Sequence, residues 1–116
     1  MIKIFTLNRC DTCRKAIAWL VSNDIDHKVI DIEADGILRR DIQKWLELVG
    51  WEALLNKRSR TWRDLSTAEQ KIFNNFQAEA LMYKRPKVIK RPIILCGTRV
   101  LVGFDEAQRL ELLSPY

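Results

Sequence analysis

Residues 2–32 read IKIFTLNRCDTCRKAIAWLVSNDIDHKVIDI, and their pattern predicts the core of the fold. Residues 2–7 are mostly apolar and rich in isoleucine, which is typical of a buried strand. Apolar side chains recur at helical spacing over residues 13–23, and residues 27–32 alternate as a second strand does. A strand, a helix and a strand in this order predict a βαβ unit with parallel strands and a right-handed connection.

The middle of the chain, after a break at Asp35-Gly36, is predicted to be helical. Residues 38–49 carry apolar side chains at i, i+4, i+7, i+8 and i+11, which predicts an amphipathic helix. Gly50 is expected to end this helix as its C′ residue, because glycine adopts the left-handed conformation easily. Residues 51–55 predict a further short turn of helix.

A second helix is predicted later in this middle part. Residues 56–64 read NKRSRTWRD and are expected to form a basic loop. The segment Ser66-Thr67-Ala68-Glu69 has the capping-box pattern that opens a helix, and Pro86 requires that helix to end by Lys84. The apolar side chains expected on it are Ile72, Phe73, Phe76 and Ala80.

The last third predicts a β-hairpin and a helix. Residues 93–96 and 99–102 are apolar strands joined by a two-residue turn, and Asp105 can cap a helix over residues 106–113. The element order is therefore β-α-β, a helical insert, and β-β-α. We expect one α/β domain over residues 1–116, with a core of residues 1–34 and 86–116 and an insert of about residues 36–85.

Composition excludes several classes of protein. The 116 residues carry a net charge of +5, with one histidine and four well-separated glycines. Two-histidine metal sites and glycine-rich phosphate loops are therefore excluded, and a Ser/His/Asp triad is not expected. No apolar run approaches the roughly 20 residues of a membrane span, and the N-terminus lacks a signal-peptide layout. We expect a cytoplasmic protein that makes no membrane contact.

The C-x-x-C of Cys10 and Cys13 is the main candidate for chemistry. It follows the first strand and opens the first helix, where the unpaired N–H groups stabilise a thiolate. Thiols in such settings have pKa values between roughly 3.5 and 7.5, and Arg9, Arg14 and Lys15 add positive charge. Cys10 is predicted to be the nucleophile, and Cys13, one turn into the helix, can resolve a mixed disulfide.

Two other interpretations of these cysteines are less favoured. The pair could be coincidental core residues, since free cysteine packs as a small hydrophobic side chain. A zinc site would need two further ligands, and only Cys96 and His27 remain. Cys96 lies in an apolar strand and is expected in the core, whereas His27 is expected to have a structural role. We expect no metal.

Two basic segments, KRSR at residues 57–60 and KRPK at residues 84–87, suggest an anion-binding surface. Acidic residues are interspersed and no nucleic-acid motif is present, so nucleic acid is not the expected partner. A solvated basic face is the simplest interpretation. The more specific one is capture of a small anion or an acidic thiol, because arginine binds carboxylates and oxyanions bidentately.

Three segments carry a resemblance to a known family: NRCDTCRKAIAWL at residues 8–20, GWEALLNKRSRTWRDL at residues 50–65, and IKRPIIL with VGFDEA between residues 89 and 107. Together they resemble the glutaredoxin-like arsenate reductase (ArsC)/Spx family. The resemblance implies a thioredoxin-like, glutaredoxin-type βαβ…ββα core with a helical insert between strands two and three. It implies that Cys10 matches the family's nucleophile and that Arg91-Pro92 matches an Arg–cis-Pro pair beside it.

Three branches of this family differ at the site. Arsenate reductases of this type hold the oxyanion with three arginines, and Arg91 matches one of them. The position that matches the first is Asn56, which is followed by Lys57 and Arg58. The third falls near the uncharged residues 102–103. Spx regulators share the C-x-x-C-R-K opening but are longer, with a charged tail. The YffB-like branch, proposed to contain glutathione-dependent thiol reductases, resembles this chain best. Cys13 departs from the single cysteine that many of its members have.

The resemblance therefore implies a cytoplasmic thiol–disulfide reductase without a bound cofactor. Cys10 would attack, and Cys13 or the co-substrate glutathione would resolve the mixed disulfide. Arg91, Lys57 and Arg58 would attract a small anionic or disulfide substrate, and glutaredoxin is a possible protein partner. The alternatives are an arsenate reductase coupled to glutathione or glutaredoxin, and an Spx-like redox-sensing regulator that binds RNA polymerase.

Overall fold

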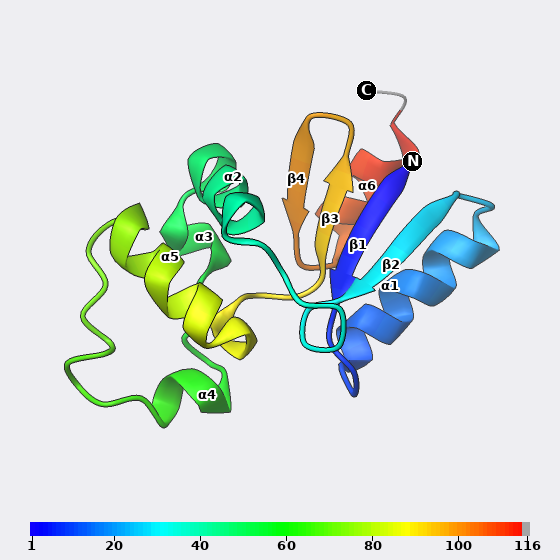
Figure 1. The fold of residues 1–116 in the computed structure, drawn as a ribbon. Coiled ribbons are helices and arrows are strands. Elements are labelled where there is room, and N and C mark those ends of the chain that lie inside the picture. Colours follow the sequence, from blue (N-terminus) through cyan, green and yellow to red (C-terminus); the bar gives the residue numbers. More distant parts are fainter. Residues whose placement is uncertain (115–116) are drawn as a thin grey trace. The chain divides into compact units, whose positions relative to one another are not determined.

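The computed structural model describes residues 1–114, which form two compact units (Figure 1). The first unit is made of Met1–Asp35 and the described residues from Arg91 onward. The second unit is Gly36–Lys90 and corresponds to the predicted insert.

The first unit is built on a four-stranded sheet. Its strands are β1 (Ile2–Thr6), β2 (His27–Asp31), β3 (Ile93–Cys96) and β4 (Arg99–Val102), and their spatial order is β2-β1-β3-β4. β1 and β2 are parallel, as predicted for the βαβ unit, whereas β1–β3 and β3–β4 are antiparallel.

Two helices pack on one face of this sheet. They are α1 (Asp11–Ser22) and α6 (Glu106–Leu113), the second opened by the predicted Asp105 cap. The cross-strand pair Ile4 and Ile94 joins their buried side chains in one cluster, which also contains Ala16, Leu20 and Leu112. This strand order and helix placement are those of a thioredoxin-like fold, so the predicted fold class is confirmed.

The second unit contains helices only. They are α2 (Arg39–Val49), α3 (Trp51–Leu54), α4 (Arg60–Arg63), α5 (Asn75–Lys84) and the 3₁₀ turn η1 (Pro86–Val88), and α2 packs against α5. Gly50 follows the last residue of α2, as predicted, but its φ of 83° and ψ of 159° lie outside the left-handed helical region. The buried side chains that fill this unit include Ile42, Trp45, Leu46, Ala78 and Met82.

The insert ends later than the sequence suggested. Residues 86–90, which we expected in the core, pack with the second unit because their backbone pairs there. Leu55 and Ile89 form an isolated bridge, and the Lys90 N–H donates to the Leu54 carbonyl at 2.8 Å. The boundary between the two units therefore lies at Lys90.

The predicted start of the last helix in the insert is wrong. Ser66 and Glu69 do exchange the two hydrogen bonds of a capping box, but they close only a turn. α5 begins at Asn75, where the Asn74 side chain accepts the Gln77 N–H at 2.9 Å and the Gln77 side chain accepts the Phe73 N–H at 2.7 Å. These local bonds stabilise a later helix start.

The segment 56–64, expected as a loop, contains α4, because the Ser59 side chain accepts the Trp62 N–H and caps it. The remaining predicted helices and strands agree with the structure to within two residues. No helix within residues 1–114 is long and apolar enough to cross a bilayer.

The corrected helix start can be tested through stability. Phe73 is 74% exposed outside α5, so Phe73→Ser should change the free energy of unfolding by no more than about 0.5 kcal/mol. If the helix began at Ser66 and buried Phe73, the same substitution would instead lower the free energy of unfolding by about 3–5 kcal/mol. Leu81→Ala, which truncates a side chain only 7% exposed in α5, is the matched control and should cost about 2–5 kcal/mol in urea unfolding.

Candidate active site

Cys10 is the N-cap residue of α1. Its backbone is extended, with φ −101° and ψ 111°, and its sulfur accepts a hydrogen bond from the Cys13 N–H at 3.3 Å. The position follows from the chain: β1 ends in the core at Thr6, and a short polar loop then leads into the helix. A thiolate at this position faces the unpaired N–H groups of the first turn, which favour negative charge.

The loop before Cys10 is held at both ends. At its start, the Thr6 carbonyl accepts the Ile32 N–H at 2.9 Å, which joins the end of β1 to the end of β2. At its end, the Arg9 N–H donates to the Asn8 side chain at 3.1 Å. Arg9 has a φ of 65°, in the left-handed region, and this turn of the backbone directs the chain into α1.

Arg91 and Pro92 lie just before β3. Because β3 is antiparallel to β1 and Ile93 pairs with Phe5, the start of β3 lies beside the end of β1 that leads to Cys10. The Arg91–Pro92 peptide bond is cis, which confirms the expectation from the resemblance. The Pro92 carbonyl accepts the Gly103 N–H at 2.9 Å, so this corner is fixed to the end of β4.

The environment of Cys10 stabilises its thiolate. Partial burial raises its pKa, but the hydrogen bonds from the Cys13 thiol and amide and the positive charge of the Arg91 guanidinium outweigh burial, so that the pKa lies below the ordinary value of a free thiol. Arg91 therefore acts on Cys10 in the direction expected of an activating cation. The arginine guanidinium stays charged at any pH the protein meets.

The environment of Cys13 has the opposite effect. Burial raises the pKa of this thiol to about 12, and the hydrogen bond to Cys10 and the charge of the Cys10 thiolate raise it as well. The side chain is only 2% exposed, whereas Cys10 is half-buried. Cys13 is thus a protonated thiol that donates to its neighbour, and the pKa values of the two sulfurs are shifted in opposite directions.

Lys57 and Arg58 belong to the second unit. The Lys57 ammonium lies 5.8 Å from the ring centre of Trp51 and 5.7 Å from that of Trp62, a cation–π arrangement on two indoles. The Arg58 N–H donates to the Asn56 side chain at 3.1 Å. The contact of Lys57 with two indoles was not predicted, because sequence spacing gives no sign that Trp51 and Trp62 lie close to one ammonium.

Cys96, which we expected in the core from the sequence, is half-buried at the edge of the core. It packs partly against the cluster of Ile4 and Ile94, and its sulfur accepts a hydrogen bond from Arg99 at 3.3 Å. It ends β3, whereas Arg91 precedes β3. Cys10 and Cys96 therefore lie toward opposite ends of the sheet, and all three cysteines are free thiols.

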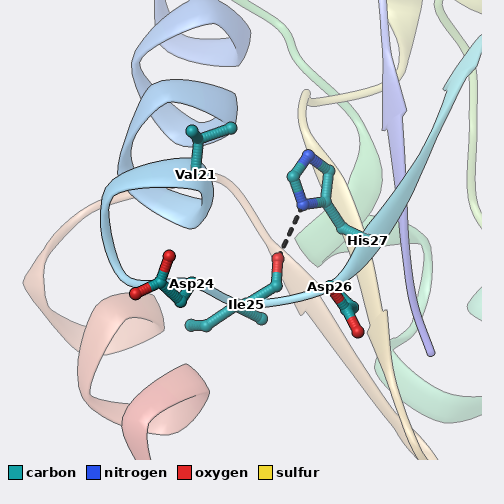
Figure 2. Close-up of a pocket in the computed structure, with 5 residues that line it drawn as sticks. All are labelled: Val21, Asp24, Ile25, Asp26 and His27. Atoms are coloured by element: carbon teal, nitrogen blue, oxygen red, sulfur yellow. Dashed lines mark hydrogen bonds between the residues drawn. The ribbon is translucent and has the colours of Figure 1, made fainter.

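His27 lies beside a shallow hollow of about 310 Å³ between α1 and β2 (Figure 2). Its Nδ1 is 2.8 Å from the Ile25 carbonyl oxygen, a contact within the turn that precedes β2. The other lining residues are Val21, Asp24 and Asp26. Across residues 1–114, no three side chains of His, Cys, Asp or Glu come together as a metal site would require.

Comparison with known proteins shows the family of this chain. The model of a protein family described as the ArsC family matches residues 5–112. The chain belongs to the ArsC family. The resemblance seen in the sequence is therefore confirmed.

Individual relatives of this ArsC family chain include proteins with different names. A solved structure of a YffB protein superposes with a TM-score of 0.92 and 32% identity, over 98% of this chain and 100% of that one. An uncharacterized protein from Haemophilus influenzae is 36% identical over 93% of this chain and 95% of its own length. The global transcriptional regulator Spx 2 from Bacillus anthracis is 31% identical, over 93% and 83%.

The difference between the two thiols predicts their order of alkylation. Brief treatment with iodoacetamide at pH 6.5 should label Cys10 at least about 10-fold faster than Cys13, because only thiolates react. Peptide mapping by mass spectrometry after quenching measures the three rates separately. Faster labelling of Cys96 than of Cys10 would contradict the assignment of the nucleophile.

The role of Arg91 can be tested by titration. Arg91→Ala should raise the pKa of the Cys10 thiol and slow its alkylation at pH 7 by roughly 10-fold, with the rate recovering as the pH rises. The thiolate absorbance near 240 nm gives the titration directly. Arg99→Ala is the matched control, since Arg99 bonds Cys96 and Glu111, and it should leave the Cys10 titration unchanged.

Proposed function

We propose that this ArsC family protein is a thiol–disulfide oxidoreductase whose nucleophile is Cys10. The observation that carries the proposal is the pairing of a stabilised thiolate with a protonated thiol at the start of α1. Cys10 is partly exposed and its pKa is lowered, while the buried Cys13 lies within hydrogen-bonding distance. Such a pair can attack one disulfide and then form another.

In the first step, the Cys10 thiolate attacks one sulfur of a substrate disulfide. The substrate S–S bond breaks, a new S–S bond joins Cys10 to one half of the substrate, and the other half leaves as a thiolate that takes a proton from solvent. Arg91 and the first turn of α1 stabilise the attacking thiolate, which favours attack by this sulfur.

In the second step, a thiolate attacks Cys10 and releases the remaining half of the substrate. The thiolate can be that of Cys13, which loses its proton to solvent; once Cys10 is in a disulfide, its negative charge no longer raises the pKa of Cys13. Two molecules of glutathione would then reduce the Cys10–Cys13 disulfide and become oxidised glutathione. Alternatively, one glutathione resolves Cys10 directly, or a glutaredoxin supplies the reducing thiols.

The proposed substrates are small anionic molecules or disulfides, and we propose no bound cofactor. Arg91 supplies positive charge at Cys10, and Lys57 and Arg58 are proposed to attract the anion. The arsenate reductase alternative uses the same nucleophile with an oxyanion substrate. The resemblance implies three positions for oxyanion-binding arginines, and in this chain only one of them, Arg91, is an arginine.

A second candidate function is a redox-sensing regulator. The similarity to a protein named global transcriptional regulator Spx 2, over most of both chains, favours it. In this case the Cys10–Cys13 disulfide would act as a sensor, and the partner would be RNA polymerase. Binding of the polymerase α subunit that depends on the oxidation state, without turnover, would support this function.

Steady-state assays distinguish these functions. The protein should reduce a glutathione mixed disulfide faster than arsenate. Both substrates are measured in the same assay, which contains glutathione, glutathione reductase and NADPH and is run with and without glutaredoxin. Cys10→Ser should lower turnover by at least about 100-fold, because it removes the nucleophile.

Two further variants complete the assay. Cys96→Ser is the matched control and should retain activity, since Cys96 lies toward the other end of the sheet. Cys13→Ser separates the two routes: retained activity indicates that glutathione resolves Cys10, and lost activity indicates that Cys13 does. Faster reduction of arsenate than of the disulfide would replace the proposed substrate class.

A further inference from the structure

Arg9 has a backbone conformation that its side chain does not favour. Within residues 1–114, only Arg9 and Asp24 combine a side chain with a positive φ, of 65° and 54°. Asp24 lies in the turn after α1, beside the hollow of Figure 2, and aspartate is one of the residues that enter the left-handed region most readily. Arginine has no such tendency, and glycine at this position would avoid the cost.

The conformation of Arg9 occurs immediately before the nucleophile. Strained backbone persists where the surrounding structure holds it, and it is concentrated at functional sites. The Asn8 side chain holds the Arg9 N–H at 3.1 Å. The strain indicates that a side chain, and not a glycine, is needed beside Cys10.

The guanidinium of Arg9 is available to a ligand. Its side chain is exposed and forms no hydrogen bond or ion pair within the part of the chain that the structure describes. The neighbouring Arg14 differs, because it pairs with Asp11. Arg91 also differs, since its charge and hydrogen bond act on the Cys10 sulfur.

A hollow of about 250 Å³ is lined by both Arg9 and Cys13. Its apolar lining comes from Leu7, Ile17 and Val29. Asp31 also lines the hollow, and one of its carboxylate oxygens already accepts the N–H groups of Glu33 and Ala34, each at 2.8 Å. The other lining residues are Thr6, Asn8 and Arg14. A substituent of a substrate bound to Cys10 can therefore lie against apolar side chains and Cys13 while a charged end reaches Arg9.

We propose that Arg9 is a specificity-determining residue that binds a carboxylate of the substrate and selects disulfides that carry one close to the sulfur. This inference rests on the proposed function. Because Arg91 is engaged with the thiolate, the incoming carboxylate needs a second cation, and Arg9 is adjacent to Cys10 in the chain. Arginine binds a carboxylate through two parallel hydrogen bonds, which lysine cannot reproduce.

The first test uses alkylation, so that it does not depend on turnover. Iodoacetate carries a carboxylate and iodoacetamide does not, and both react with the Cys10 thiolate. Arg9→Gly should lower the ratio of the two rates at Cys10 by about 5–10-fold, with iodoacetamide nearly unchanged. Arg9→Lys should give an intermediate ratio. Asp24→Gly makes the same backbone change away from the cysteines and should leave the ratio as it is.

The second test uses substrates. Arg9→Gly should raise KM for oxidised glutathione by about 10-fold, while kcat and the activity on neutral hydroxyethyl disulfide stay within about twofold of the parent protein. An equal fall for both disulfides would show that Arg9 acts only on the Cys10 thiolate, and an unchanged alkylation ratio would overturn the inference. If the parent protein reduces neither disulfide, the proposed function fails, and the alkylation ratio still decides whether Arg9 binds carboxylates.

Discussion

The hydrogen bond from the Cys13 N–H to the Cys10 sulfur is the contact on which the site depends. It exists because Cys10 is the N-cap of α1 and Cys13 is three residues further, so that one turn of helix brings an amide to the sulfur. The same spacing brings the Cys13 thiol close enough to donate to Cys10. A shift of the helix start by one residue would remove both interactions, which makes the end of β1 at Thr6 a constraint on the chemistry.

The sheet adds what the helix cannot supply. A helix N-terminus contributes a modest partial charge, and burial acts against the thiolate. The antiparallel pairing of β3 with β1 brings Arg91, remote in sequence, to the Cys10 end of β1. The result is that the pKa of one thiol is lowered and the pKa of its neighbour is raised, a difference produced by position and not by residue type.

The start of α5 was predicted wrongly because the chain offers two capping patterns. The chain between Ser66 and Gln77 holds two capping patterns, and both form their hydrogen bonds. What separates them is tertiary: the Asn75 side chain accepts the Trp51 N–H and donates to the Leu46 carbonyl, which ties the second start to α2 and α3. Propensity cannot rank two caps when the deciding partners lie more than twenty residues away.

The sequence was enough to predict the βαβ unit, the C-x-x-C at its strand–helix junction, the hairpin and the last helix, because periodicity and capping are local properties. It also located the cis proline, through family resemblance. The opposite pKa shifts of Cys10 and Cys13 and the two indoles around Lys57 arise only in the folded chain. These properties depend on burial and on charges brought together from distant parts of the chain, and such contacts leave no periodic signal in the sequence.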